Sequence, residues 1–131
     1  MSSRRKFLLS ASAITIAPVV FSNHVSTNTE KLTHHVFFWL KNQKSKEDLT
    51  ELMEGLRSLK KIKSLRGCKI GIPASTEKRD VVDSSYSISL LIFFEDVKGH
   101  DEYQVDPIHT RFVEKYSHLW SRVVVYDSVD V

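Results

Sequence analysis

His109 and Tyr103 are the residues whose chemistry best suits a reaction. A histidine titrates near neutral pH and can take a proton from a carbon acid or a phenol. A tyrosine hydroxyl can donate a hydrogen bond to an oxygen that gains negative charge. His109 follows Asp106-Pro107, a pair typical of a helix start, because proline suits the first helical position and aspartate accepts a free amide. A helix N-terminus disfavours a positive imidazole, so we expect His109 to be neutral and able to act as a base.

Both residues also have a purely structural interpretation. His109 shares one predicted helix face with four large side chains, so it could be a core histidine bonded to the backbone or to Tyr103. These four are Phe112, Val113, Tyr116 and Trp120. Tyr103 could be a half-buried helix residue. The sequence leaves both alternatives open.

Metal and phosphate chemistry find less support in the sequence. His100, His109 and His118 are too far apart for a local ligand motif. Glu114 and His118 have the i, i+4 spacing of a ligand pair, but that spacing also suits an exposed pair on a helix. The glycines at 55, 67, 71 and 99 form no phosphate-binding pattern. We therefore expect neither a metal nor a cofactor.

The first 22 residues have the features of an export signal. The basic group Arg4-Arg5-Lys6 precedes an uncharged apolar run, Phe7 to Phe21, and resembles a twin-arginine signal. The run is shorter than the roughly 20 apolar residues of a spanning helix, and Pro18 interrupts it. An ordinary amphipathic helix and an uncleaved anchor are the alternatives, and the cleavage position stays open.

These features predict a signal peptide over 1–22, a polar linker over 23–32 and a domain over 33–131. We expect the domain to be exported, periplasmic or otherwise extracytoplasmic, and free of the membrane once the signal is removed. The whole chain has 19 Lys and Arg against 16 Asp and Glu, and removal of Arg4, Arg5 and Lys6 leaves 16 of each sign. Without a net positive charge, the domain has no global field for nucleic acid.

Hydrophobic periodicity predicts the elements that must position His109 and Tyr103. Strands are expected at 34–40, 65–72, 86–95 and 121–128, and helices at 46–61 and from 107 onwards, with weaker helical character at 97–105. Ser45 and Asp48 resemble a capping box, and one apolar face follows, made of Leu49, Leu52, Met53, Leu56 and Leu59. The order β-α-β-β-α-β predicts a ferredoxin-like α+β fold.

Two of the predicted strands are apolar on both faces. In strand 86–95, Leu91 and Phe93 lie opposite the main apolar face, and strand 34–40 carries Phe37 in the same way. Helices can cover only one of these faces, so the other needs a second cover. The simplest cover is the same sheet of another copy. Cys68 is the only cysteine, so packing must stabilise the domain without an intrachain disulfide.

Three motifs resemble those of the Dabb family, the stress-responsive A/B-barrel domains. They are His34-His35-Val36-Phe37-Phe38-Trp39-Leu40-Lys41, Tyr103-x-x-Asp106-Pro107-x-His109 and Trp120-x-x-Val123-Val124-Val125-Tyr126-Asp127. The resemblance covers roughly Thr33 to Val129 and is strongest to exported bacterial members. It implies ferredoxin-like subunits that pair through their sheets into a dimeric α+β barrel. It says little about activity, because many members have no known reaction.

The resemblance also implies a site. Plant polyketide cyclases of this family use a tyrosine and a histidine in a Y-x-x-H-P-x-H motif, and Tyr103 and His109 occupy those two positions. Asp106 stands in place of the first histidine, which keeps the helix start and removes one imidazole. Either His34 or His35 corresponds to the family's first-strand histidine. Some related barrels bind haem through a histidine, but no motif in this chain supports haem.

The barrel would offer an apolar cleft lined by Phe37, Leu91 or Phe93, which suits a small apolar or aromatic ligand. The sequence therefore favours an exported homodimer that binds such a ligand without a known reaction. The alternative is a cofactor-free cyclase or lyase with His109 as general base and Tyr103 as oxyanion donor. The sequence does not identify the ligand.

Overall fold

The structure, a computed structural model, describes residues 17–18 and 31–131, so the predicted signal and linker lie almost wholly outside the described residues. Four strands form one antiparallel sheet in the order β2-β3-β1-β4. The strands are β1 (Leu32–Leu40), β2 (Leu65–Gly71), β3 (Ile88–Phe94) and β4 (Trp120–Val129). Within the described residues, no helix has the length and apolar character needed to cross a membrane.

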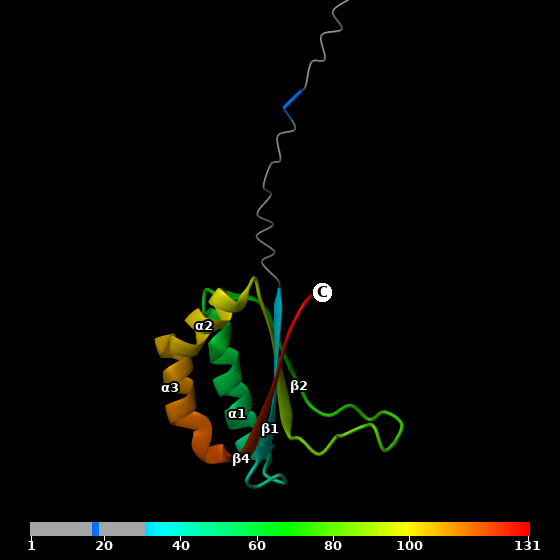
Figure 1. The fold of residues 1–131 in the computed structure, drawn as a ribbon. Helices are drawn as coiled ribbons and strands as arrows, with labels where there is room; N and C mark the ends of the chain where they lie inside the picture. The colour runs from blue at the N-terminus through cyan, green and yellow to red at the C-terminus, as the bar shows by residue number, and fades with distance from the viewer. Residues whose placement is uncertain (1–16, 19–30) are drawn as a thin grey trace, which may run out of the picture.

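The helices all cover the same face of the sheet (Figure 1). They are α1 (Lys46–Ser58), α2 (Val97–Val105) and α3 (Pro107–Tyr116), with short 3-10 turns at Leu59–Lys61 and Ser117–Leu119. The ferredoxin-like order predicted from periodicity is confirmed. The expected start of α1 is also present, because the Ser45 side chain accepts a hydrogen bond from the Asp48 amide.

The segment between β3 and β4 differs from the expectation in two ways. Residues 97–105 form a regular helix, because Asp96 caps it by accepting the Gly99 amide at 2.8 Å. The next helix ends at Tyr116, so Trp120 begins β4 instead of continuing the helical face. Its ring still packs in the core, with centroids 5.0 Å from Phe38 and 5.8 Å from Phe112.

The core lies between the sheet and the helices. Its most buried side chains come from β1, α1, the 3-10 turn after α1, β3 and α2, and they are Leu40, Leu52, Leu56, Leu59, Ile88, Leu90, Ile92, Phe94 and Tyr103. The two long helices approach closely at Gly55. A β-carbon at that position would stand 2.7 Å from the Tyr116 ring, so only glycine allows α1 and α3 to pack this tightly.

The side chains of β1 alternate between the two faces of the sheet. Leu32, His34, Val36, Phe38 and Leu40 are buried toward the helices, and the residues between them are half-buried on the other face. The register pairs His34 with Ile92 of β3 and with Asp127 of β4. This central strand therefore carries one histidine to the helical side of the sheet.

Among residues 31–131, no helix lies over the second face of the sheet (Figure 1). On this face Phe93 keeps 37% of its surface exposed and Tyr126 keeps 66%. The segment between β2 and β3 has no helix or strand, and it projects away from the helices. The two-sided apolar character expected of β1 and β3 is thus present in the folded chain.

Candidate functional site

Three side chains with acid–base capacity meet at one cavity between the sheet and the helices. His34 comes from β1, Tyr103 from α2 and His109 from α3, and the cavity has a volume of about 160 Å³. The Tyr103 ring centroid lies 5.7 Å from that of His34 and 4.4 Å from that of His109. The other walls are mostly apolar, and they are Val36, Phe38, Leu90, Gln104, Phe112, Val113, Trp120, Val123 and Val125.

Local structure at the start of α3 sets the orientation of His109. Asp106 accepts the Ile108 amide at 2.8 Å and Pro107 occupies the first helical turn, as the sequence predicted. His109 Nδ1 lies 3.1 Å from the carbonyl oxygen of Gln104. A carbonyl only accepts, so Nδ1 carries the proton and Nε2 keeps a free lone pair.

Burial lowers the pKa of His109, and it outweighs the Gln104 carbonyl and the Asp106 charge, which act in the opposite direction. The nearby His100 also lowers this pKa. His109 is therefore neutral at pH 7, and its Nε2 can accept a proton.

Tyr103 is only 2% exposed, and burial raises the pKa of its hydroxyl. The hydroxyl makes no hydrogen bond to another side chain or backbone group among the described residues. Among residues 31–131, the only side-chain polar atom that is both fully buried and without a hydrogen-bond partner is Ser64 Oγ. The Tyr103 hydroxyl has no partner, so it is not fully buried. Tyr103 thus keeps its proton and has a donor free for a ligand.

His34 is held by a contact that sequence reasoning missed. Its Nδ1 lies 2.6 Å from Asp127 Oδ1, across the β1–β4 pair. Burial lowers the pKa of His34 despite the hydrogen bond and charge of Asp127. A neutral ring that donates Nδ1–H to the carboxylate leaves Nε2 as the nitrogen available in the cavity.

His100 of α2 joins this contact. Its ring centroid is 5.1 Å from that of His34, and its Nε2 lies 3.9 Å from Asp127 Oδ2. Among the residues that the structure describes, His34, His100 and Asp127 are the one set of three close enough to hold a metal ion. The sequence carried no local signal for this set, because its members are spread from residue 34 to residue 127.

The residues predicted to bind a ligand lie on two different faces of the sheet. His34 joins Tyr103 and His109 at the cavity. His35, Phe37, Leu91 and Phe93 lie on the opposite face of the sheet, because neighbouring strand residues point to opposite sides. On that face, Phe37 lines a separate hollow of about 120 Å³ with Trp39, Asp83, Tyr86 and Tyr126. A ligand-binding role for these four residues stays a prediction.

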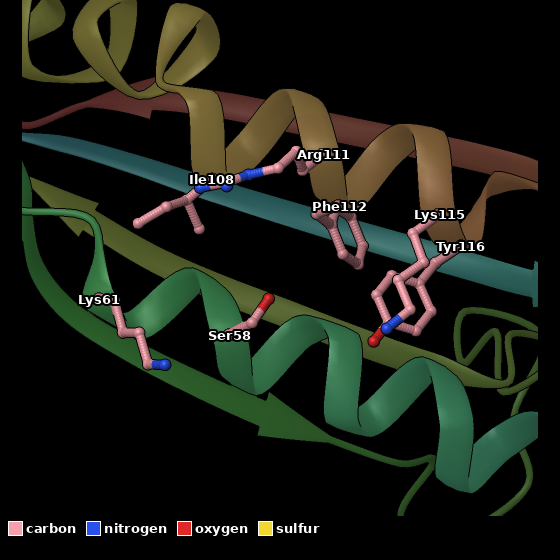
Figure 2. A pocket seen from close by; sticks show the side chains of 7 residues that line it. All are labelled: Ser58, Lys61, Ile108, Arg111, Phe112, Lys115 and Tyr116. Atoms are coloured by element: carbon pink, nitrogen blue, oxygen red, sulfur yellow. The ribbon is translucent and has the colours of Figure 1, made fainter.

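A wider groove of about 310 Å³ lies between α1 and α3 (Figure 2). Phe112 and Tyr116 extend into it from α3, and its polar lining consists of Ser58, Lys61, Arg111 and Lys115. The Ser58 hydroxyl already donates to the Gly55 carbonyl. This groove has no histidine or other group with an ordinary pKa near neutrality, so the smaller cavity is the better candidate for proton transfer.

The lowered pKa of His109 predicts a pH-dependent stability. The unfolded chain binds a proton on this ring near its ordinary pKa of 6.5, and the folded chain resists protonation to lower pH. Between the lowered pKa of the folded state and the ordinary pKa of the unfolded state, the unfolded chain binds more protons than the folded chain. The free energy of unfolding should therefore fall as pH drops from about 7.5 to about 5. In urea denaturation, His109→Gln should make this slope shallower, and His34, whose pKa burial also lowers, contributes to the remaining slope. His118→Gln, at an exposed position, should keep the full slope. An equal slope in His109→Gln would contradict the assignment.

Solved structures with a similar fold come from plants and bacteria. The hydroxynitrile lyase of Passiflora edulis is 18% identical, with a TM-score of 0.66 over 79% of this chain and 95% of its own. A Dabb family protein of Mesorhizobium loti with a ferredoxin-like fold is also 18% identical, with a TM-score of 0.64 over 78% and 98%. A dimeric ferredoxin-like protein of unknown function from Thermobifida fusca is 14% identical, with a TM-score of 0.62 over 77% and 92%.

At these identities the likeness shows the fold. No curated protein matches this sequence. The family is shown by the sequence itself, since residues 32–130 match the stress responsive A/B barrel domain from the first residue of β1 to one residue beyond β4. This chain therefore belongs to the stress-responsive A/B barrel (Dabb) family.

Proposed function

We propose that this protein binds a small apolar or aromatic compound in the cavity between sheet and helices and moves a proton on it. In this proposal His109 is the general base and Tyr103 is the hydrogen-bond donor to the developing oxyanion. The observation that supports it is the meeting of a neutral His109, a neutral His34 and a protonated Tyr103 at one mostly apolar cavity.

The proposed step is proton abstraction from a carbon next to a carbonyl group. His109 Nε2 takes the proton, the electron pair of the C–H bond moves toward the carbonyl, and the oxygen becomes an enolate. The Tyr103 hydroxyl donates to that oxygen, and the raised pKa of Tyr103 keeps the donor proton on the phenol. The bond from His109 Nδ1 to the Gln104 carbonyl holds the ring and stabilises the imidazolium that forms.

The cavity limits the substrate to a compact compound. A volume of about 160 Å³ with walls of valine, leucine, phenylalanine and tryptophan favours a single ring over a charged or extended molecule. The hydroxynitrile lyase with this fold supports chemistry on small molecules, although at 18% identity it does not extend its substrate to this chain.

Ligand binding without turnover is the second candidate. The close packing of the Tyr103 and His109 rings and the bond to Gln104 also describe a satisfied pair in a core. An experiment that reports binding and proton transfer at the same time distinguishes catalysis from ligand binding alone.

Acetophenone, a single-ring ketone with an acidic methyl group, is a suitable probe. We expect the protein to accelerate exchange of its methyl protons for deuterium, measured by NMR in D2O with a chelator present. His109→Gln should slow exchange about 10²-fold or more, and Tyr103→Phe about tenfold or more, because base and oxyanion donor act in the same step. His118→Gln should exchange like the parent protein. Binding of acetophenone without any acceleration would contradict the acid–base proposal and support the binding role.

We also propose that two copies pair through the second face of the sheet. The exposed Phe93 and Tyr126 and the half-buried Phe37 and Leu91 form a face that no helix of residues 31–131 covers. Burial of each large side chain contributes about 1.5–3 kcal/mol. The Thermobifida fusca protein with this fold is described as dimeric.

Sedimentation velocity at micromolar concentration should therefore show a dimer. Phe93→Glu places a charge on the proposed interface and should shift the protein to a monomer. Val97→Glu is the matched control, since Val97 is 51% exposed on the helical side, and it should remain dimeric. A parent protein that sediments as a monomer would contradict the pairing.

Export by the folded-protein route is the third proposal. It rests on Arg4-Arg5 and the uncharged run that follows them. Replacement of both arginines by lysine conserves the charge and should leave the precursor in the cytoplasm, as measured by fractionation and immunoblot. Normal export of the double variant would show that the pair is not read as a twin-arginine signal.

A further inference from the structure

His34, His100 and Asp127 converge from three elements, β1, α2 and β4, and His34 also lines the cavity. Their ligand atoms all lie within 4.8 Å of one another. His34 Nδ1 is 2.6 Å from Asp127 Oδ1, and His100 Nε2 is 3.9 Å from Asp127 Oδ2. The proton-transfer role proposed above uses His109 and Tyr103 and leaves His100 without a function.

The contacts of His100 place its Nε2 opposite the Asp127 carboxylate. His100 Nδ1 lies 3.2 Å from Asp101 Oδ1, so Nδ1 carries the proton and Nε2 keeps its lone pair. The exposed Gln104 amide lies 3.2 Å from that Nε2 and can donate to it or move away. The lone pair of Nε2 and the carboxylate of Asp127 thus face each other as two acceptors, an arrangement that a positive ion stabilises.

The distances suit a first-row transition metal. Zinc holds imidazole nitrogen and carboxylate oxygen at about 2.0–2.2 Å, so neighbouring ligand atoms in a tetrahedral site stand about 3.3 Å apart. The separation of His34 Nδ1 from Asp127 Oδ1 is 2.6 Å and that of His100 Nε2 from Asp127 Oδ2 is 3.9 Å, so the two lie on either side of this value.

The burial of the three side chains suits a metal site whose ligands are fixed by packing and whose ion can enter from solvent. The His34 and His100 side chains are 4% and 17% exposed, and their rings pack against Phe94 with centroids 6.1 and 5.6 Å away. The Asp127 side chain is 42% exposed, which gives an ion a path from solvent and leaves a fourth position for water. The contact of Asp101 with His100 has the form of the carboxylate–histidine–metal support common in zinc sites.

We propose that His34, His100 and Asp127 bind one divalent transition-metal ion, with zinc favoured by the imidazole and carboxylate ligands. The ion takes the place of the proton that His34 shares with Asp127. With the metal on Nδ1, the Nε2 of His34 carries a proton, so His34 changes from an acceptor to a donor toward the cavity. The site binds its ion whether or not the protein catalyses proton transfer.

The test is zinc binding to the untagged chain, stripped with chelator and titrated by calorimetry. The parent protein should bind one zinc per chain, and His100→Gln should weaken the affinity by about tenfold or more, because it removes one of three ligands. Asp127→Asn should weaken it similarly, although its amide oxygen can still accept from His34 and preserve the local packing. Asp101→Asn should weaken zinc affinity by about tenfold, because the Asp101 carboxylate orients the His100 ring.

His118→Gln is the matched control, since it removes an exposed histidine outside the cluster and should leave zinc affinity unchanged. Cobalt gives a second readout, because a tetrahedral Co²⁺ site absorbs visible light, and this absorption should vanish in His100→Gln. Far-UV circular dichroism verifies that each variant is folded. Unchanged zinc affinity in folded His100→Gln and Asp127→Asn, or an equal loss in His118→Gln, would overturn the proposal.

Discussion

The alternation of side chains along β1 is the constraint on which the rest of the site depends. β1 lies between β3 and β4, so each of its residues faces a partner on both sides. The pleat sends His34 toward the helices and His35 toward the open face. A shift of one residue would exchange these two histidines and would remove His34 from both Asp127 and the cavity.

Burial then decides the chemistry of the groups that β1 and the helices bring together. Desolvation lowers the pKa of His34 and of His109 and raises that of Tyr103, so the two imidazoles are bases and the phenol remains a donor at neutral pH. Asp106, at the position where the motif of the resembled cyclases has a histidine, acts as the N-cap of α3 in this chain. Asp106 caps α3 and thereby holds the turn that presents His109.

The two faces of the sheet have different functions in this picture. The helical face holds the core and the cavity, and the open face carries the apolar residues that need a partner. The cavity lining does not include Phe37, Leu91 or Phe93, which lie on the open face. A ligand for the hollow beside Phe37 would bind at or near the proposed interface between copies.

Much of the fold could be read from the sequence, because the signals are local. The period of the apolar residues predicts the strands and the helices, and single side chains such as Ser45 and Asp106 determine where helices begin. The pairing of Tyr103 with His109 was accessible for the same reason, since a short turn joins the two helices that carry them.

The sequence by itself determined the order of elements, the caps at Ser45 and Asp106 and the two-sided apolar strands, and it named His109 and Tyr103 as the candidate base and donor. Only the tertiary structure decided which strand histidine reaches the cavity and which groups surround it. His34 meets Asp127 across 93 positions of the chain, through the register of β1 and β4 and not through any local pattern. Such contacts depend on how strands pair and how α2 docks, and no spacing of residues along the chain encodes them.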